Sequence, residues 1–263
     1  MMDVCVLGPM EICSSGRADR VCLAPKPRTV LALLCGHPGQ MISVACLVRE
    51  VWGEEPPASS LRNMHTYVLQ VRKLLACLCG VSTRAVSQEL LVTHPGGYSL
   101  SEAALGFDHR TFTELTGAGR GRLRDGELLA GIGDLLQALR IWRGPAFADV
   151  VTGPVLEAQR RQLHDARIGA MEALSEARIS AGQFHEVISD LSSFVAENPL
   201  HEGLHFHYMR ALALSGGRAR ALEVFSRLRL NLVSELGIEP GASMQQLQRC
   251  ILNSTDPAMA SGL

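Results

Sequence analysis

The sequence predicts a mainly α-helical protein with a small β component, in which a winged helix-turn-helix precedes a helical-repeat domain. Three observations support this fold class. A basic helix follows a Pro-rich loop, a short hairpin follows that helix, and the chain beyond residue 104 has helical periodicity throughout. We therefore expect a winged-helix DNA-binding domain over residues 1–104, an all-α domain over 105–252, and a flexible tail over 253–263.

The basic helix is expected to begin just after Pro56 and Pro57, where Ser59 or Ser60 offers a side-chain oxygen to the first-turn amides. Apolar residues then recur at spacings of three and four and predict a buried stripe of Leu61, Met64, Val68, Val71 and Leu75. The opposite face carries polar and basic side chains: Arg62, Asn63, Thr66, Gln70 and Lys73, with Tyr67 and Arg72 on its margins.

These residue types are suited to duplex DNA. Arginine grips guanine bidentately, asparagine and glutamine do the same to adenine, threonine meets a thymine methyl, and lysine neutralises phosphate. We expect base contacts from Asn63, Thr66 and Gln70, phosphate contacts from Arg72 and Lys73, and either kind from Arg62. Tyr67 and Arg84, the next cation along the chain, are further expected DNA-binding residues. The alternative is a solvated helix face, because such faces are common.

A β-hairpin is predicted after the basic helix. Leu90–Thr93 and Tyr98–Leu100 are the two expected strands, and Pro95-Gly96-Gly97 supplies the turn. Such a wing lies along the phosphate backbone or reaches the minor groove, with His94 and Tyr98 as its expected contacts. The alternative for Tyr98 is an aromatic side chain that anchors the wing to the core.

The second domain is expected to consist of helices only. They are predicted from Phe107, over 127–142 and over about 155–180, followed by three shorter helices divided by Gly182, Asn198-Pro199 and Gly216-Gly217. Aligning residues 181–187 with 215–221 gives an offset of 34 residues (215 − 181), the period of tetratricopeptide helix pairs.

Several motifs together resemble one family. WGEEPP, HTYVLQVRKLL and THPGGYSL resemble the winged helix of the Streptomyces antibiotic regulatory proteins, which is similar to that of OmpR-type response regulators. VCVLGPMEI resembles its opening strand, and KPRTVLALLCGHPGQMIS its first helix and the next strand. LRIWRGPAFADV, AGQFHEVISDL, ENPLHEGLHFHYMRALALSGGRARALEVF and LVSELGIEPGASMQQL resemble the family's bacterial transcriptional activation domain, a tetratricopeptide-like bundle. His94 departs from the arginine that is common there.

This resemblance implies a transcriptional activator. Family members bind direct repeats of duplex DNA beside the promoter −35 region as side-by-side copies, and they recruit RNA polymerase holoenzyme to secondary-metabolite (antibiotic) biosynthetic genes. The loop with Glu54, Glu55 and Ser59 would then face the sigma or alpha subunit of the polymerase. The alternative for the two acids is that they improve solubility and repel non-specific DNA.

Composition excludes several other classes. A net charge of −1 argues against a protein that coats nucleic acid, so DNA affinity must come from a local patch. No apolar stretch is long enough for a signal peptide or a membrane span, and the eight cysteines are interpreted as reduced thiols of a cytoplasmic protein. Cys77 and Cys79 lack the second pair that structural zinc needs, and the phosphate-binding motif G-x-x-x-x-G-K-[ST] is missing, so no metal or cofactor is expected.

The sequence is compatible with two alternative functions. His201-Glu202-Gly203-Leu204-His205 matches the zinc-protease motif H-E-x-x-H, with Glu223 as a conceivable third ligand. The surrounding repeat explains this spacing better, so we expect a solvated His-Glu pair and no enzyme. A helical-repeat interaction protein, whose winged helix has a minor or lost DNA role, is the second alternative.

Overall fold

The computed structural model describes residues 2–14, 17–103 and 105–253, which form two compact units. The first contains the described residues up to Glu114 together with Arg140–Ala166, and the second contains Leu115–Leu139 and the described residues from Arg167 onward. The two compact units therefore interleave along the chain, and neither begins at the boundary predicted between residues 104 and 105. The tail predicted from residue 253 lies, from residue 254 onward, outside the described residues.

A four-stranded sheet opens the first unit. Its order is β3-β2-β1-β7, and β1 pairs antiparallel with β2 and parallel with β7. Val4 on β1 lies opposite Ile12 and Phe107, and all three side chains are buried, as the period of two along a strand requires. The strands are β1 (Met2–Cys5), β2 (Glu11–Ser14), β3 (Arg17–Arg20) and β7 (Leu105–Phe107).

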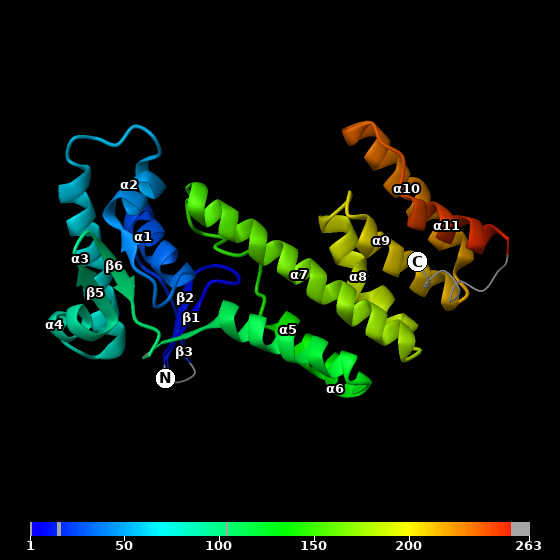
Figure 1. The fold of residues 1–263 in the computed structure, drawn as a ribbon, viewed down its shortest axis with the longest axis horizontal. Coiled ribbons are helices and arrows are strands. Elements are labelled where there is room, and N and C mark those ends of the chain that lie inside the picture. The colour runs from blue at the N-terminus through cyan, green and yellow to red at the C-terminus, as the bar shows by residue number, and fades with distance from the viewer. Residues whose placement is uncertain (1, 15–16, 104, 254–263) are drawn as a thin grey trace. The chain divides into compact units, whose positions relative to one another are not determined.

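The winged helix follows this sheet in the first unit (Figure 1). Its helices are α1 (Pro25–Gly36), α2 (Val44–Trp52), α3 (Ser60–Cys79) and α4 (Thr83–Ala85), and a π-helical turn, η1, covers Val86–Leu90. A second sheet has the order β4-β6-β5, with β4 (Ile42–Ser43), β5 (Leu91–His94) and β6 (Gly97–Leu100). Gly96 turns the hairpin with a φ of +85°, so the predicted wing is confirmed.

The segment that begins at Arg140 packs against the residues directly after β1, which explains why Arg140–Ala166 belongs to the first unit. The amide of Arg143 donates to the carbonyl of Leu7 (2.8 Å), and that of Phe147 donates to Val6 (2.8 Å). The Asp108 carboxylate accepts the amides of Val6 and Leu7 at 2.9 Å each. This segment therefore completes the core of the first unit.

The helices of the second part follow the predicted order. They are α5 (Asp108–Arg124), α6 (Leu128–Arg140), α7 (Pro154–Ser180), α8 (Phe184–Glu197), α9 (Glu202–Leu214), α10 (Arg218–Leu236) and α11 (Ala242–Leu252). The starts of α8 and α10 differ by 34 residues (218 − 184), which equals the offset in the sequence. The separate helix α11 was not predicted, although a left-handed glycine, Gly237, and the turn signal Pro240-Gly241 mark the break before it.

Each of the eight cysteines is a free thiol. Among the helices in the described ranges, none combines the length and the apolar character that a membrane span requires.

Candidate DNA-binding site

The buried stripe of α3 holds the candidate recognition helix against α1 and α2. Met64, Val68, Val71 and Leu75 are buried, as predicted. Leu61 is 59% exposed, so its predicted burial is wrong. Ser60 is buried instead, because it lies four residues before Met64 and continues the stripe at helical spacing.

The opposite face of α3 presents a row of exposed polar side chains. Arg62, Gln70 and Lys73 are exposed, and none of them has a side-chain hydrogen bond or ion pair within the described ranges. The Thr66 hydroxyl donates to the carbonyl of Arg62 (3.2 Å), so its methyl group is left for apolar contacts. This face therefore offers unused donors and one methyl group to a ligand.

Asn63 and Ser59 bind each other at the start of α3. The Asn63 amide donates to the Ser59 hydroxyl at 3.1 Å. Ser59 occupies the N-cap position, but its side chain accepts no first-turn amide, so that part of the prediction is wrong. Asn63 must exchange this bond for one to adenine if it reads a base.

Tyr67 is part of an aromatic contact between α2 and α3. Its ring stacks on Trp52 with centroids 5.8 Å apart and planes inclined by 22°, and the Lys26 ammonium lies 5.1 Å from the centre of the Trp52 ring. The stack fixes the crossing of the two helices. Lys26 was not singled out from the sequence, and it adds an exposed cation beside this contact.

Arg72 attaches the wing to α3 and does not face outward as predicted. Its guanidinium donates to the carbonyl of Leu91 (2.7 and 3.1 Å) and to the hydroxyl of Thr93 (2.7 Å). It lies 5.9 Å from the centre of the Tyr98 ring, and burial lowers the pKa of Arg72 from its ordinary value. Arg72 is therefore a positioning residue for the wing, and within the described residues only its Nη1 donors are left for the predicted phosphate contact.

Tyr98 is only 4% exposed, so the contact with DNA predicted for it is corrected. Its hydroxyl lies 3.4 Å from Nδ1 of His65, and the aromatic-anchor alternative describes its position. His94 is half-buried, and its Nε2 lies 2.7 Å from the hydroxyl of Ser99. The wing thus presents His94 at its end, beside the exposed turn at Pro95 and Gly96.

Arg84 lies apart from the other candidates. It is exposed in α4, beyond the C-terminal end of α3. Arg62 and Cys79 alone are separated by about 25 Å along the helix axis, at 1.5 Å per residue. The structure therefore does not bring Arg84 together with Arg62, Thr66 and Gln70.

Leu69 is a candidate contact that sequence reasoning missed. It is 45% exposed, and its spacing places it on the same face as Arg62, Thr66 and Lys73. An exposed apolar side chain among polar ones suits a thymine methyl group. The sequence could have indicated this contact, because Leu69 is an apolar residue of the helix that lies outside the predicted buried stripe.

The loop between α2 and α3 is exposed from Gly53 to Ser59. Arg49 Nε donates to Glu54 Oε1 (3.1 Å), and both side chains are largely solvated. Glu55 has no ion-pair partner among the residues that the structure describes. An exposed pair of this kind contributes little to stability, so both acids remain available to a partner.

Glu50 links α2 to the start of α7. Its buried carboxylate accepts the amides of Gly153 (2.7 Å), Val155 (2.9 Å) and Leu156 (3.1 Å). These are unpaired first-turn donors of α7, which favour a negative charge. Nothing in the sequence around Glu50 signals this role, because the partners lie about one hundred residues away.

The H-E-x-x-H segment lies in the second unit at the start of α9. Nδ1 of His201 accepts the amide of Leu204 (3.3 Å), and Nδ1 of His205 lies 3.0 Å from the carbonyl of His201. His205 is buried, and burial lowers its pKa. Within residues 2–14, 17–103 and 105–253, no three His, Cys, Asp or Glu side chains gather as metal ligands would. The motif contributes a helix cap and buried packing.

Neighbouring residues in α3 give a matched pair of variants. Arg72→Ala removes charge-assisted hydrogen bonds to Leu91 and Thr93 and should lower the free energy of unfolding by about 2 kcal/mol. Lys73→Ala removes an exposed cation and should change it by less than about 0.5 kcal/mol. Urea denaturation followed by tryptophan fluorescence measures both. Equal losses would contradict the positioning role of Arg72.

Comparisons with known proteins agree with this geometry. Residues 107–252 match the bacterial transcriptional activator domain, and residues 18–100 match the C-terminal domain of transcriptional regulatory proteins. Regulatory protein DnrI of Streptomyces peucetius is 36% identical over 98% of this chain and 94% of its own length. Regulatory protein AfsR of Streptomyces coelicolor is 33% identical over 97% of this chain and 24% of its own length.

A solved structure has the same fold. The structure of Mycobacterium tuberculosis EmbR, in complex with a low affinity phosphopeptide, matches with a TM-score of 0.84 at 30% identity. The match covers 98% of this chain and 68% of that chain. The winged helix and the helical domain together define a bacterial transcriptional regulator. The chain belongs to the Streptomyces antibiotic regulatory protein family of transcriptional activators.

Proposed function

We propose that this chain binds direct DNA repeats near the promoter −35 region and recruits RNA polymerase to secondary-metabolite, antibiotic biosynthetic genes. The observation that carries the proposal is the outer face of α3, where Arg62, Gln70 and Lys73 are exposed and unpaired within the described ranges. It acts by binding rather than catalysis, in the cytoplasm where its promoters lie.

Two neighbouring copies on DNA supply the affinity that one copy lacks. The chain has a net charge of −1, and each copy places only a few cations on α3. Counterion release by so few phosphate contacts gives weak binding at physiological salt. When two adjacent copies also contact polymerase, the overall affinity rises, because after the first copy binds, each further contact forms within the same complex.

The α2–α3 loop is the proposed polymerase contact. Glu54 and Glu55 are exposed and would be repelled by phosphates, so they favour a basic surface of the sigma or alpha subunit. Glu54→Lys together with Glu55→Lys should leave operator affinity equal or higher and reduce promoter activation in vitro. Unchanged activation would favour the alternative that the acids only improve solubility.

The DNA contacts are tested by variants with different expected signatures. Lys73→Ala should weaken binding to all sequences and reduce the slope of log K against log salt by about one. Asn63→Ala or Gln70→Ala should cost about 1–3 kcal/mol at one operator position and leave the salt slope unchanged. Fluorescence anisotropy over a salt series and a set of single-base operator variants gives both quantities.

The function itself is tested by footprinting. Purified full-length protein should protect direct repeats upstream of genes that neighbour its own. No protection at any of these promoters would contradict the proposal. The alternative of a helical interaction protein gains support if Arg62→Ala/Lys73→Ala protein still complements a deletion strain, since that variant lacks two cations of the DNA face.

A further inference from the structure

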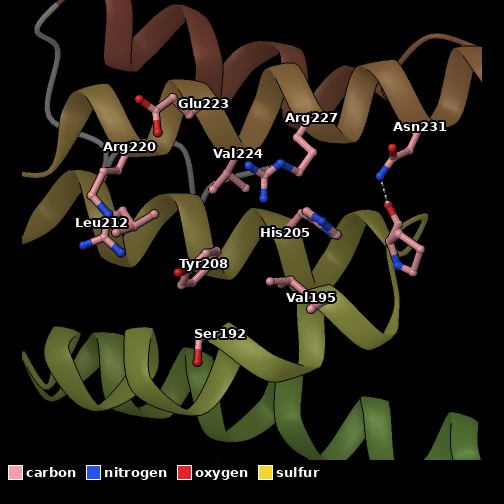
Figure 2. A pocket seen from close by; sticks show the side chains of 12 residues that line it. Ser192, Val195, His205, Tyr208, Leu212, Arg220, Glu223, Val224, Arg227 and Asn231 are labelled. Atoms are coloured by element: carbon pink, nitrogen blue, oxygen red, sulfur yellow. Dashed lines mark hydrogen bonds between the residues drawn. The ribbon is translucent and has the colours of Figure 1, made fainter.

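A groove in the second unit is lined by α8, α9 and α10, and nothing in the function above uses it. Its volume is about 330 Å³, and it is partly open to solvent. Val195, Tyr208, Leu212 and Val224 give it an apolar floor and walls (Figure 2). Leu212 is 1% exposed, so this floor is a firm part of the core.

Two arginines of α10 line the groove. Arg220 and Arg227 are both exposed and have no ion-pair partner among the described residues. Figure 2 shows both guanidinium groups pointing from α10 toward α9, and Glu223, which lies between them in the chain, lines the same groove. The groove therefore presents two arginines and one glutamate, a net positive charge, beside an apolar surface.

The spacing of these cations matches an extended chain. Arg220 and Arg227 are seven residues apart, about 10 Å along the axis of α10. Two residues three positions apart in an extended peptide are also about 10 Å apart. The two cations can therefore pair with two carboxylates three positions apart in an extended segment.

One end of the groove is closed by a bond between its own walls. The Asn231 amide donates to the carbonyl of Pro199 at 3.4 Å (Figure 2). His205 lies on the same wall, and its Nδ1 is occupied by the carbonyl of His201. The Asn231 amide and Nδ1 of His205 are therefore already bonded, whereas Arg220 and Arg227 keep their charges for a ligand.

We propose that this groove binds an extended acidic peptide segment of a partner protein, with two carboxylates three residues apart on Arg220 and Arg227 and a small apolar side chain between them. The arginines fix the register of the peptide, and Tyr208 with Val224 contacts the apolar residue. This binding is independent of the DNA face of α3, so it stands or falls separately from the proposed function.

The test uses full-length protein and a fluorescein-labelled hexapeptide with glutamates at its second and fifth positions and valine and alanine between them. Fluorescence anisotropy should show tighter binding of this peptide than of the same peptide with glutamines. Arg220→Ala/Arg227→Ala should weaken binding about tenfold, since two partly enclosed ion pairs are worth that change. Arg124→Ala/Arg140→Ala, which removes two exposed arginines outside the groove, is the matched control and should not change it.

A charge reversal makes the test specific. Arg220→Glu/Arg227→Glu should bind the hexapeptide with lysines at the two positions better than the one with glutamates, and circular dichroism checks that the variants fold. The proposal is overturned if the wild type binds no peptide, if the control loses as much as the groove variant, or if a helix-forming acidic peptide binds more tightly. It is also overturned if the groove variants weaken only duplex DNA binding, which would assign the arginines to DNA.

Discussion

Replacing Glu50 with alanine should lower the free energy of unfolding of the first unit by about 3 kcal/mol. The variant leaves three amides, those of Gly153, Val155 and Leu156, without their acceptor in a buried place. Each buried amide that loses its acceptor costs about 1–3 kcal/mol. Part of this cost is offset, because the variant no longer buries a charged carboxylate. The wing and α3 should unfold with α2, so operator binding should weaken as well.

Tryptophan fluorescence isolates the first unit in this experiment, because Trp52 and Trp142 are the only tryptophans and both lie in it. Glu55→Ala is the matched control, since it removes an exposed acid five residues away and should shift the urea midpoint little. An equal shift in both variants would contradict the capping role of Glu50.

A second variant approaches the same contact from the other side. A Cβ on residue 153 would lie 2.3 Å from the Glu50 carbonyl oxygen, so Gly153→Ala must displace α2 or the start of α7. Overpacking of this kind costs about 1–3 kcal/mol. Unchanged stability of Gly153→Ala would mean that the two segments are not in close contact.

Local patterns in the sequence were sufficient to predict most of the helices and the wing. The Pro-Pro loop, the stripe from Met64 to Leu75 and the Gly-Gly turn act within a few residues of the structure that they determine. The 34-residue offset likewise follows from turns at Gly182 and Gly216, whose φ values are positive. Local backbone preference and side-chain period need no knowledge of distant residues.

The site was predicted less completely, because the roles of its side chains depend on distant partners. Arg72 has the same residue type and helix position as a phosphate contact, yet its guanidinium is taken by Leu91, nineteen residues away. Ser60 is buried where Leu61 was predicted, although Ser60 lies four residues before Met64 and Leu61 three, and both spacings suit a helix. Glu50 meets its partners only through tertiary packing. Sequence period cannot distinguish an unused cation from one that is already bound.

Acid should destabilise the first unit through His109, by about 3 kcal/mol between pH 6.5 and pH 4. His109 is 8% exposed, and burial, assisted by the positive charge of Arg110, lowers the pKa of His109 to about 4. The unfolded chain binds a proton on this imidazole near pH 6.5, whereas the folded chain keeps it neutral until about pH 4. Stability is therefore intact above pH 6.5 and falls as pH drops through this window, by about 1.4 kcal/mol per unit.

Comparison of the wild type with His109→Asn separates this imidazole from the other titrating groups, because Asp108, His37 and Arg110 beside it are present in both proteins. The variant should lose stability at neutral pH, since Asn fills the buried site less well, and its unfolding free energy should decline less steeply from pH 6.5 to 4. Urea titrations at half-unit steps, followed by tryptophan fluorescence, give both curves. Replacing the exposed His185 by Asn should leave the wild-type slope unchanged. Parallel curves for the wild type and His109→Asn would mean that His109, which lies in the first turn of α5 beside Phe107, is not held neutral by its burial.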